Sequence, residues 1–117
     1  MTDLNNITID WTSHGNAIRK GIECERDDTL PMNPAIWAEL DGNTIVFEFG
    51  PSRNLVGHDE NFISEQAYEI CNYESDRAAE DFTDADLAEI AEWYSSPGNF
   101  DGRQTEIQLL DSLADAQ

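Results

Sequence analysis

Few side chains of this sequence belong to the types that perform nucleophilic or metal chemistry. The histidines are His14 and His58, and neither lies in a recognisable catalytic motif; no Gly-x-Ser-x-Gly elbow occurs. The cysteines, Cys24 and Cys71, are also isolated, so a zinc site would need all four side chains to converge. Lys20 is the only lysine, and no phosphate-binding glycine loop surrounds it. We therefore expect no catalytic residues, no metal and no cofactor.

The carboxylates are too numerous for paired acids to indicate a glycosidase, because some pair always falls at a suitable distance. A calcium loop starting at Asp81 also fails, since its fifth position is Ala85 and its sixth is Asp86. An EF-hand needs an oxygen ligand and a glycine at those positions. The acids therefore indicate neither a glycosidase nor an EF-hand.

The charge balance names a class of partner more clearly than a reaction. The 117 residues include 25 acidic and 6 basic side chains, which gives a formal net charge of −19 and a pI near 4.1. Direct binding to nucleic acid or to an anionic membrane is disfavoured, because both depend on clustered Lys and Arg. No apolar run reaches the length of a membrane span, and the first ten residues do not resemble a secretory signal. With two cysteines and no disulfide framework, we expect a cytoplasmic protein with reduced thiols.

Residues 1–58 show the period-two alternation that is typical of strands. Residues 7–11 alternate, a turn is indicated at 14–16, and 18–24 form a further candidate strand. Gly15 and Gly21 weigh against a helix in this region. The clearest signal is a hairpin over 36–49, because Asp-Gly separates two alternating apolar runs.

Residues 59–117 follow a helical period and carry 16 acids against 2 bases, a net charge of −14. Helices are predicted at 63–73 and, as a short helix, at 75–80. A third starts after Thr83, whose side chain and that of Asp86 form a capping box, with Phe82 packing on Leu87. A fourth follows Asp101. Its apolar stripe consists of Ile107, Leu110, Leu113 and Ala114.

These elements predict an α+β fold for a single domain spanning 1–117. About four antiparallel strands in 1–58 precede three or four helices in 59–117, which pack on one face of the sheet. The outer side of the helices then carries most of the charge. The residues on that side are the candidate partner-binding residues, and we call them the acidic face. Trp93 would serve as its aromatic anchor. The acidic face consists of Glu65, Glu69, Asp76, Glu80, Asp84, Asp86, Glu89, Glu92 and Trp93.

The clustering of acidic residues lowers the stability of the protein, because carboxylates at i, i+4 destabilise a helix and high net charge destabilises the compact state. We therefore look for a function that the clustered charge serves. Carboxylates one helical turn apart are spaced on the same order as DNA phosphates. In charge and length the chain resembles phage-encoded DNA mimics that block CRISPR or restriction systems. This resemblance implies an inhibitor, acting in the host cytoplasm, that occludes the basic nucleic-acid-binding cleft of a target protein.

Three other interpretations stay open, and one of them is a small acidic enzyme with a metal-dependent carboxylate site. The chain also resembles the acidic immunity proteins that inhibit toxin nucleases. Alternatively, it is a small halophilic or regulatory domain whose acidity is an adaptation to solvent. Such an adaptation should place acids on every face of the domain, and the concentration of charge in 59–117 argues against it. The sequence marks no dimer interface and does not identify the target.

Overall fold

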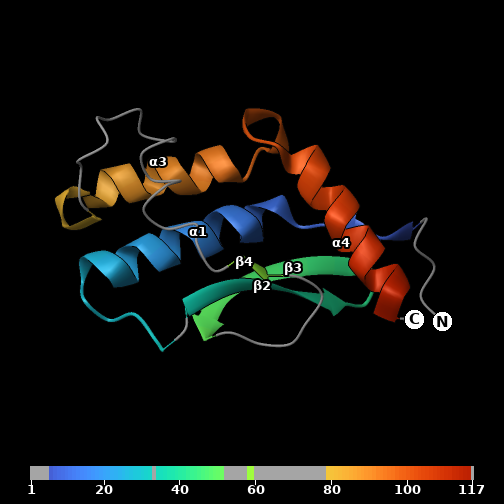
Figure 1. The fold of residues 1–117 in the computed structure, drawn as a ribbon. Coiled ribbons are helices and arrows are strands. Elements are labelled where there is room, and N and C mark those ends of the chain that lie inside the picture. The colour runs from blue at the N-terminus through green and yellow to red at the C-terminus, as the bar shows by residue number, and fades with distance from the viewer. Residues whose placement is uncertain (1–5, 33, 52–57, 60–78, 117) are drawn as a thin grey trace.

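A computed structural model describes residues 6–32, 34–51, 58–59 and 79–116. The predicted helices at 63–73 and 75–80 lie outside these ranges, apart from the last two residues of the second. The described elements follow one another along the chain as shown in Figure 1. They are β1 (Thr8–Ile9), α1 (Trp11–Arg26), β2 (Pro34–Asp41), β3 (Thr44–Pro51), β4 (His58–Asp59), the 3-10 turn η2 (Ala79–Asp81), α3 (Asp84–Tyr94), the 3-10 turn η3 (Pro97–Asn99) and α4 (Gly102–Ala116).

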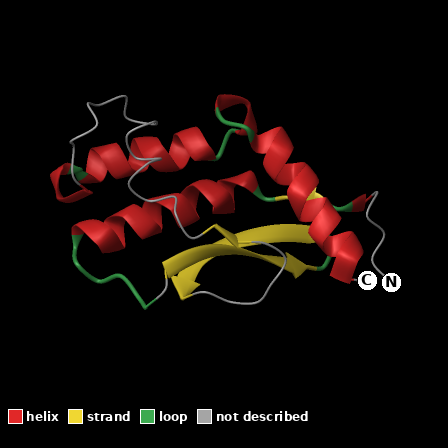
Figure 2. Cartoon of the chain, in the orientation of Figure 1, coloured by secondary structure: helices red, strands yellow, loops and turns green. Residues whose placement is uncertain are grey.

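The fold is α+β, as predicted, but its helices are layered differently from the expectation. Helix α1 covers one face of the sheet, and α3 packs on the side of α1 that is turned away from the strands (Figures 1 and 2). Helix α4 crosses one end of this stack and contributes Leu109 and Leu113 to the core. The outward face of α3 is therefore one layer further from the sheet than a helix packed directly on the strands. No helix in the described residues is long and apolar enough to cross a membrane.

The sheet has the order β1-β3-β2-β4 and is built around one long hairpin. The hairpin prediction is confirmed: β2 and β3 pair antiparallel, with Asp41 opposite Thr44. Gly42 has a φ of 64°, which is the conformation that a type II′ turn requires at its first central residue. The expectation of about four antiparallel strands is wrong in detail. Strand β1 is two residues long and runs parallel to β3, whereas β4 pairs antiparallel with β2 over two residues.

Residues 11–26 form a helix, so the turn predicted at 14–16 and the strand predicted at 18–24 are wrong. The side chain of Asp10 caps the helix by accepting a hydrogen bond from the Ser13 backbone N–H at 3.1 Å. Gly15 is buried where α1 meets α3, and a Cβ placed there would lie 2.9 Å from the backbone nitrogen of Ser95. Gly15 therefore serves close helix–helix contact rather than a turn.

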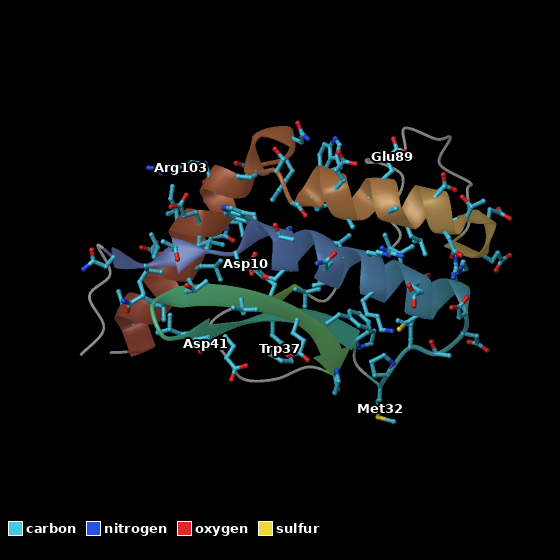
Figure 3. The ribbon with its side chains drawn as sticks, turned by 180° about the vertical axis from the view of Figure 1, so that it is seen from behind. Asp10, Met32, Trp37, Asp41, Glu89 and Arg103 are labelled. Atoms are coloured by element: carbon cyan, nitrogen blue, oxygen red, sulfur yellow. The ribbon has the colours of Figure 1, made fainter. Side chains whose placement is uncertain are left out.

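The core lies between the sheet and the helices. The alternation of β2 and β3 turns Ile36, Ala38, Ile45 and Phe47 toward α1, where they meet Ile18 and Ile22. Trp37 is also buried, although its position in the alternation places it on the opposite face of the sheet (Figure 3). Strand β2 is thus buried on both of its faces around Trp37.

The two C-terminal helices begin as predicted. The Thr83 hydroxyl accepts from the Asp86 N–H at 3.2 Å, and the Asp86 carboxylate accepts from the Thr83 N–H at 2.9 Å, which confirms the capping box. The Asp101 carboxylate accepts from the Gln104 N–H at 3.3 Å at the start of α4.

The predicted apolar stripe of α4 is only partly correct. Leu109 and Leu113 are buried, whereas Ile107 is 40% exposed and Ala114 is also exposed. The helix is rotated so that the row through Leu109 and Leu113 faces the core. Several apolar rows were available on this helix, and tertiary packing selects one of them.

Candidate partner-binding surface

The acidic face is described only in part. Glu65, Glu69 and Asp76 lie outside the described residues. Glu80 is exposed on η2, and the remaining predicted residues belong to α3. The site can therefore be built from η2 and the outward side of α3.

Glu89 and Glu92 are the clearest members of the acidic face. Both side chains are exposed, and Glu89 lies on the side of α3 that is turned away from α1 (Figure 3). The buried residues Leu87, Ile90, Ala91 and Tyr94 occupy the other side of the helix. Within the described part of the chain, neither carboxylate forms an ion pair. The ion pairs there join Lys20, Arg26 and Arg103 to other acidic side chains. These two charges are thus available to a cationic partner.

Asp84 belongs to an ion-pair cluster that joins two helices. Its Oδ1 lies 2.9 Å from Nη1 of Arg26, whose Nε also donates to Asp27 at 2.9 Å. The Arg26 guanidinium holds the pKa of Asp27 below its usual value, mainly through the hydrogen bond and also through charge attraction, while desolvation opposes the shift. Because the Asp84 side chain is 86% exposed, solvent screens the pair strongly. Asp84 therefore links the start of α3 to the end of α1, as well as adding charge to the surface.

Asp86 is half-buried and has the capping role that the sequence predicts, in addition to its place on the acidic face. Its carboxylate accepts the Thr83 N–H in the capping box. A carboxylate in the first turn is also stabilised by the partial positive charge of the helix N-terminus. Asp86 is thus the member of the acidic face whose substitution would most directly damage the fold.

Trp93 is half-buried rather than fully exposed. Its ring lies 4.9 Å from that of Tyr94, edge to face, and 6.1 Å from that of Phe100. It packs against the core from the outside. The contacts with Tyr94 and Phe100 fix the ring in place, while part of it stays accessible.

Sequence reasoning missed the surroundings of His14. The ring is half-buried and stacks on Phe100 at 5.0 Å with an interplanar angle of 8°. Phe47 and Trp11 meet it edge to face at 4.7 and 5.6 Å, and its Nδ1 lies 3.2 Å from the carbonyl oxygen of Tyr94. This packing ties α1 to the C-terminal end of α3 and supports Phe100, which in turn contacts Trp93. The signal was a helical spacing of Trp11, His14 and Ile18, which the nearby glycines obscured.

Exposed acids also occur away from the acidic face. Glu39, Asp41 and Glu48 lie on the hairpin, and their positions in the alternation place them on the face of the sheet opposite α1. Figure 3 shows Asp41 and Glu89 at opposite sides of the molecule. The strands therefore also carry exposed acids, although most acids lie in 59–117. The carboxylates of the hairpin can serve as a control for charge changes on α3.

No group of three or more His, Cys, Asp or Glu side chains within the described ranges is arranged to hold a metal ion. On the acidic face, the described residues offer exposed carboxylates and the partly accessible ring of Trp93. Comparison of the chain with protein-family models, with curated proteins and with solved structures finds no match.

Proposed function

We propose that the protein is an inhibitor that imitates nucleic acid and occupies the basic cleft of a nucleic-acid-binding protein, such as a CRISPR or restriction effector. The observation that carries the proposal is the outward side of α3, where Glu89 and Glu92 are exposed without ionic partners in the described chain, next to the partly accessible Trp93. The proposed action is steric occlusion, with no turnover and no cofactor.

The spacing of these charges suits a cleft that normally holds phosphates. Glu89 and Glu92 are three residues apart, which corresponds to about 4.5 Å along the helix axis. Phosphates follow one another at about 3.4 Å of axis on each strand of a duplex. Arg and Lys side chains that pair with successive phosphates are thus spaced closely enough to pair with successive carboxylates of α3.

The electrostatics favour rapid association with such a target. A net charge of −19 on 117 residues produces a strong negative field, and complementary fields accelerate encounter. Fields of this kind steer partners weakly at high salt. A fixed aromatic side chain within a charged surface is the type of residue that contributes most of the affinity in protein interfaces. Trp93 supplies it beside Glu89 and Glu92.

The test is capture of a partner from the lysate of the cell in which the protein occurs, at low salt, followed by elution with duplex DNA or RNA. We expect release of a nucleic-acid-binding protein by the competing nucleic acid. A partner that resists nucleic acid and salt would support the immunity-type alternative and contradict mimicry. Absence of any partner, together with a fold that needs molar salt, would show that the acidity is solvent adaptation.

Charge reversal locates the binding surface. The test variant changes Glu80, Glu89 and Glu92 to Lys, and it avoids Asp84 and Asp86 because these contribute to an ion pair and a helix cap. We expect it to lose capture of the partner and to stay folded, since its three side chains are exposed.

The matched control makes the same change in net charge on the hairpin, by changing Glu39, Asp41 and Glu48 to Lys. We expect the control to retain capture. Asp10 is unsuitable as a control because its carboxylate caps α1. Equal loss in both variants would mean that net charge alone attracts the partner, and full capture by the test variant would exclude α3 as the binding surface.

A further inference from the structure

Glu89 and Trp93 are four residues apart on α3, so their side chains are neighbours on the surface of the helix. Typical Cβ separations for this spacing are about 6 Å. Ala85, one turn before Glu89, is exposed and small, so its own side chain leaves room for a partner side chain beside the pair. The two residues thus offer a carboxylate and an indole ring to the same incoming group.

The indole ring is held in a fixed position by the aromatic residues beneath it. Trp93 contacts Tyr94 and Phe100, and Phe100 stacks on His14 at 5.0 Å. A ring that is already ordered loses little conformational entropy when a partner binds to it. Trp93 is therefore prepared to receive a flat group on its accessible part.

Arginine is the side chain that matches this pair. Its guanidinium is planar, stacks on aromatic rings, and offers a fork of N–H donors that pairs with a carboxylate through two hydrogen bonds. The ammonium group of lysine is a compact, strongly hydrated charge and lacks this geometry. A nucleobase would also stack on Trp93, but its phosphate would be repelled by Glu89 and Glu92.

We infer that Glu89 and Trp93 together form a seat for one arginine side chain of the partner protein. The inference rests on the proposed function, because it names the group on the partner that the α3 surface selects. It also separates two contributions to binding. The many carboxylates attract any basic protein, whereas the Glu89–Trp93 pair discriminates arginine from lysine.

The experiment measures binding of two labelled probes of equal charge, a hexa-arginine and a hexa-lysine peptide, to the full chain at 0.15 M NaCl. We expect wild type to bind hexa-arginine more tightly, with about two- to fivefold of the preference due to stacking on the indole. In Trp93→Leu that part of the preference disappears, although the net charge is unchanged. A circular dichroism spectrum matching that of wild type establishes that the variant is folded.

A second pair of variants tests the carboxylate without changing the aromatic packing. Glu89→Gln and Glu48→Gln each remove one exposed charge, the first in the seat and the second on the hairpin. We expect Glu89→Gln to weaken hexa-arginine binding more than Glu48→Gln does, and to lower the preference for arginine.

Three results would overturn the inference: the same peptide preference in wild type and Trp93→Leu, equal effects of the two glutamine variants, or binding of a single-stranded oligonucleotide that depends on Trp93. These results are distinguishable from failure of the proposed function, which shows in the lysate capture and its reversal by duplex. A partner released by duplex with no change in capture for Trp93→Leu would retain mimicry and reject the seat.

Discussion

Replacing Gly15 by alanine tests whether close contact between α1 and α3 explains the buried glycine. On an isolated helix, Gly→Ala stabilises by up to about 1 kcal/mol. In this fold the new Cβ would lie 2.9 Å from the Ser95 nitrogen and still closer to the Ala91 carbonyl oxygen and the Ser95 hydroxyl. Two of these three atoms belong to the backbone of α3 and its cap, so a change of side-chain rotamer cannot relieve the overlap.

The expected magnitude follows from these opposing effects. Overpacking a well-packed interior costs about 1–3 kcal/mol, and backbone obstacles place Gly15→Ala toward the upper end. After subtraction of the gain in helix propensity, the net destabilisation is about 2 kcal/mol. With an unfolding entropy of about 2.1 cal/mol/K per residue, the 117-residue chain should lose about 8 °C in Tm.

The assay is thermal and urea unfolding followed by circular dichroism, with Gly98→Ala as the matched control. A Cβ on Gly98 has no atom within 4 Å, so that variant should be as stable as wild type or slightly more stable. If Gly15→Ala is as stable as Gly98→Ala, the close packing of α1 on α3 is wrong. The reassignment of 11–26 as a helix packed against α3 would then lose its main physical reason.

Three further predictions concern the end of α1, the start of α3 and the ion pair of Arg26 with Asp27. Asp28 has a φ of 57° just after α1, so Asp28→Gly should raise the free energy of unfolding by about 1 kcal/mol, measured by urea titration; a loss of stability would contradict this. Thr83→Ala removes the capping box and should cost about 1 kcal/mol in the same titration, whereas no change would mean that the cap contributes nothing. Arg26→Gln should raise the pKa of Asp27 toward its usual value, observed by NMR. Because that pKa is lowered in the folded state, the stability linked to it is present above the usual pKa and is lost as the pH falls through the lowered one. The difference in free energy of unfolding between wild type and Arg26→Gln should therefore become smaller in acid. A difference that does not change with pH would refute this linkage.

The hairpin and α3 could be predicted from the sequence because their signals are local. Gly42 supplies the backbone conformation that the turn needs, and Thr83 with Asp86 satisfies the first N–H groups of α3 within four residues. The α+β class follows from these two segments. Such signals do not depend on which parts of the chain pack together.

Helix α1 could not be predicted by the same reasoning, because its glycine at 15 is explained by a residue 80 positions away. Gly15 disfavours a helix in isolation. Its lack of a side chain is explained only by the close approach of Ser95, at the end of the neighbouring helix α3. Asp10 as a cap and the spacing of Ile18 and Ile22 were available signals for a helix. The spacing of Ile18 and Ile22 fits a helical period as well as the period-two alternation of a strand.

The acidic face shows the same division between local and tertiary information. The outward direction of Glu89 and Glu92 follows from the helical period alone. The pairing of Asp84 with Arg26 depends on how α3 lies against α1. The partial burial of Trp93 depends on the loop that carries Phe100. Angular position on a helix identifies which residues point outward, but it cannot show which of them are already engaged.

The proposed function requires that the protein and nucleic acid compete for one cleft of the target. The most direct measurement takes the captured target with a labelled duplex and adds the protein in increasing amounts at 0.1 M salt, while sedimentation reports every complex present. We expect the duplex to be released in proportion to the protein bound, with no ternary complex, and we expect the variant carrying Lys at 80, 89 and 92 to release none. A stable complex of target, duplex and protein together would contradict occlusion of the nucleic-acid-binding cleft.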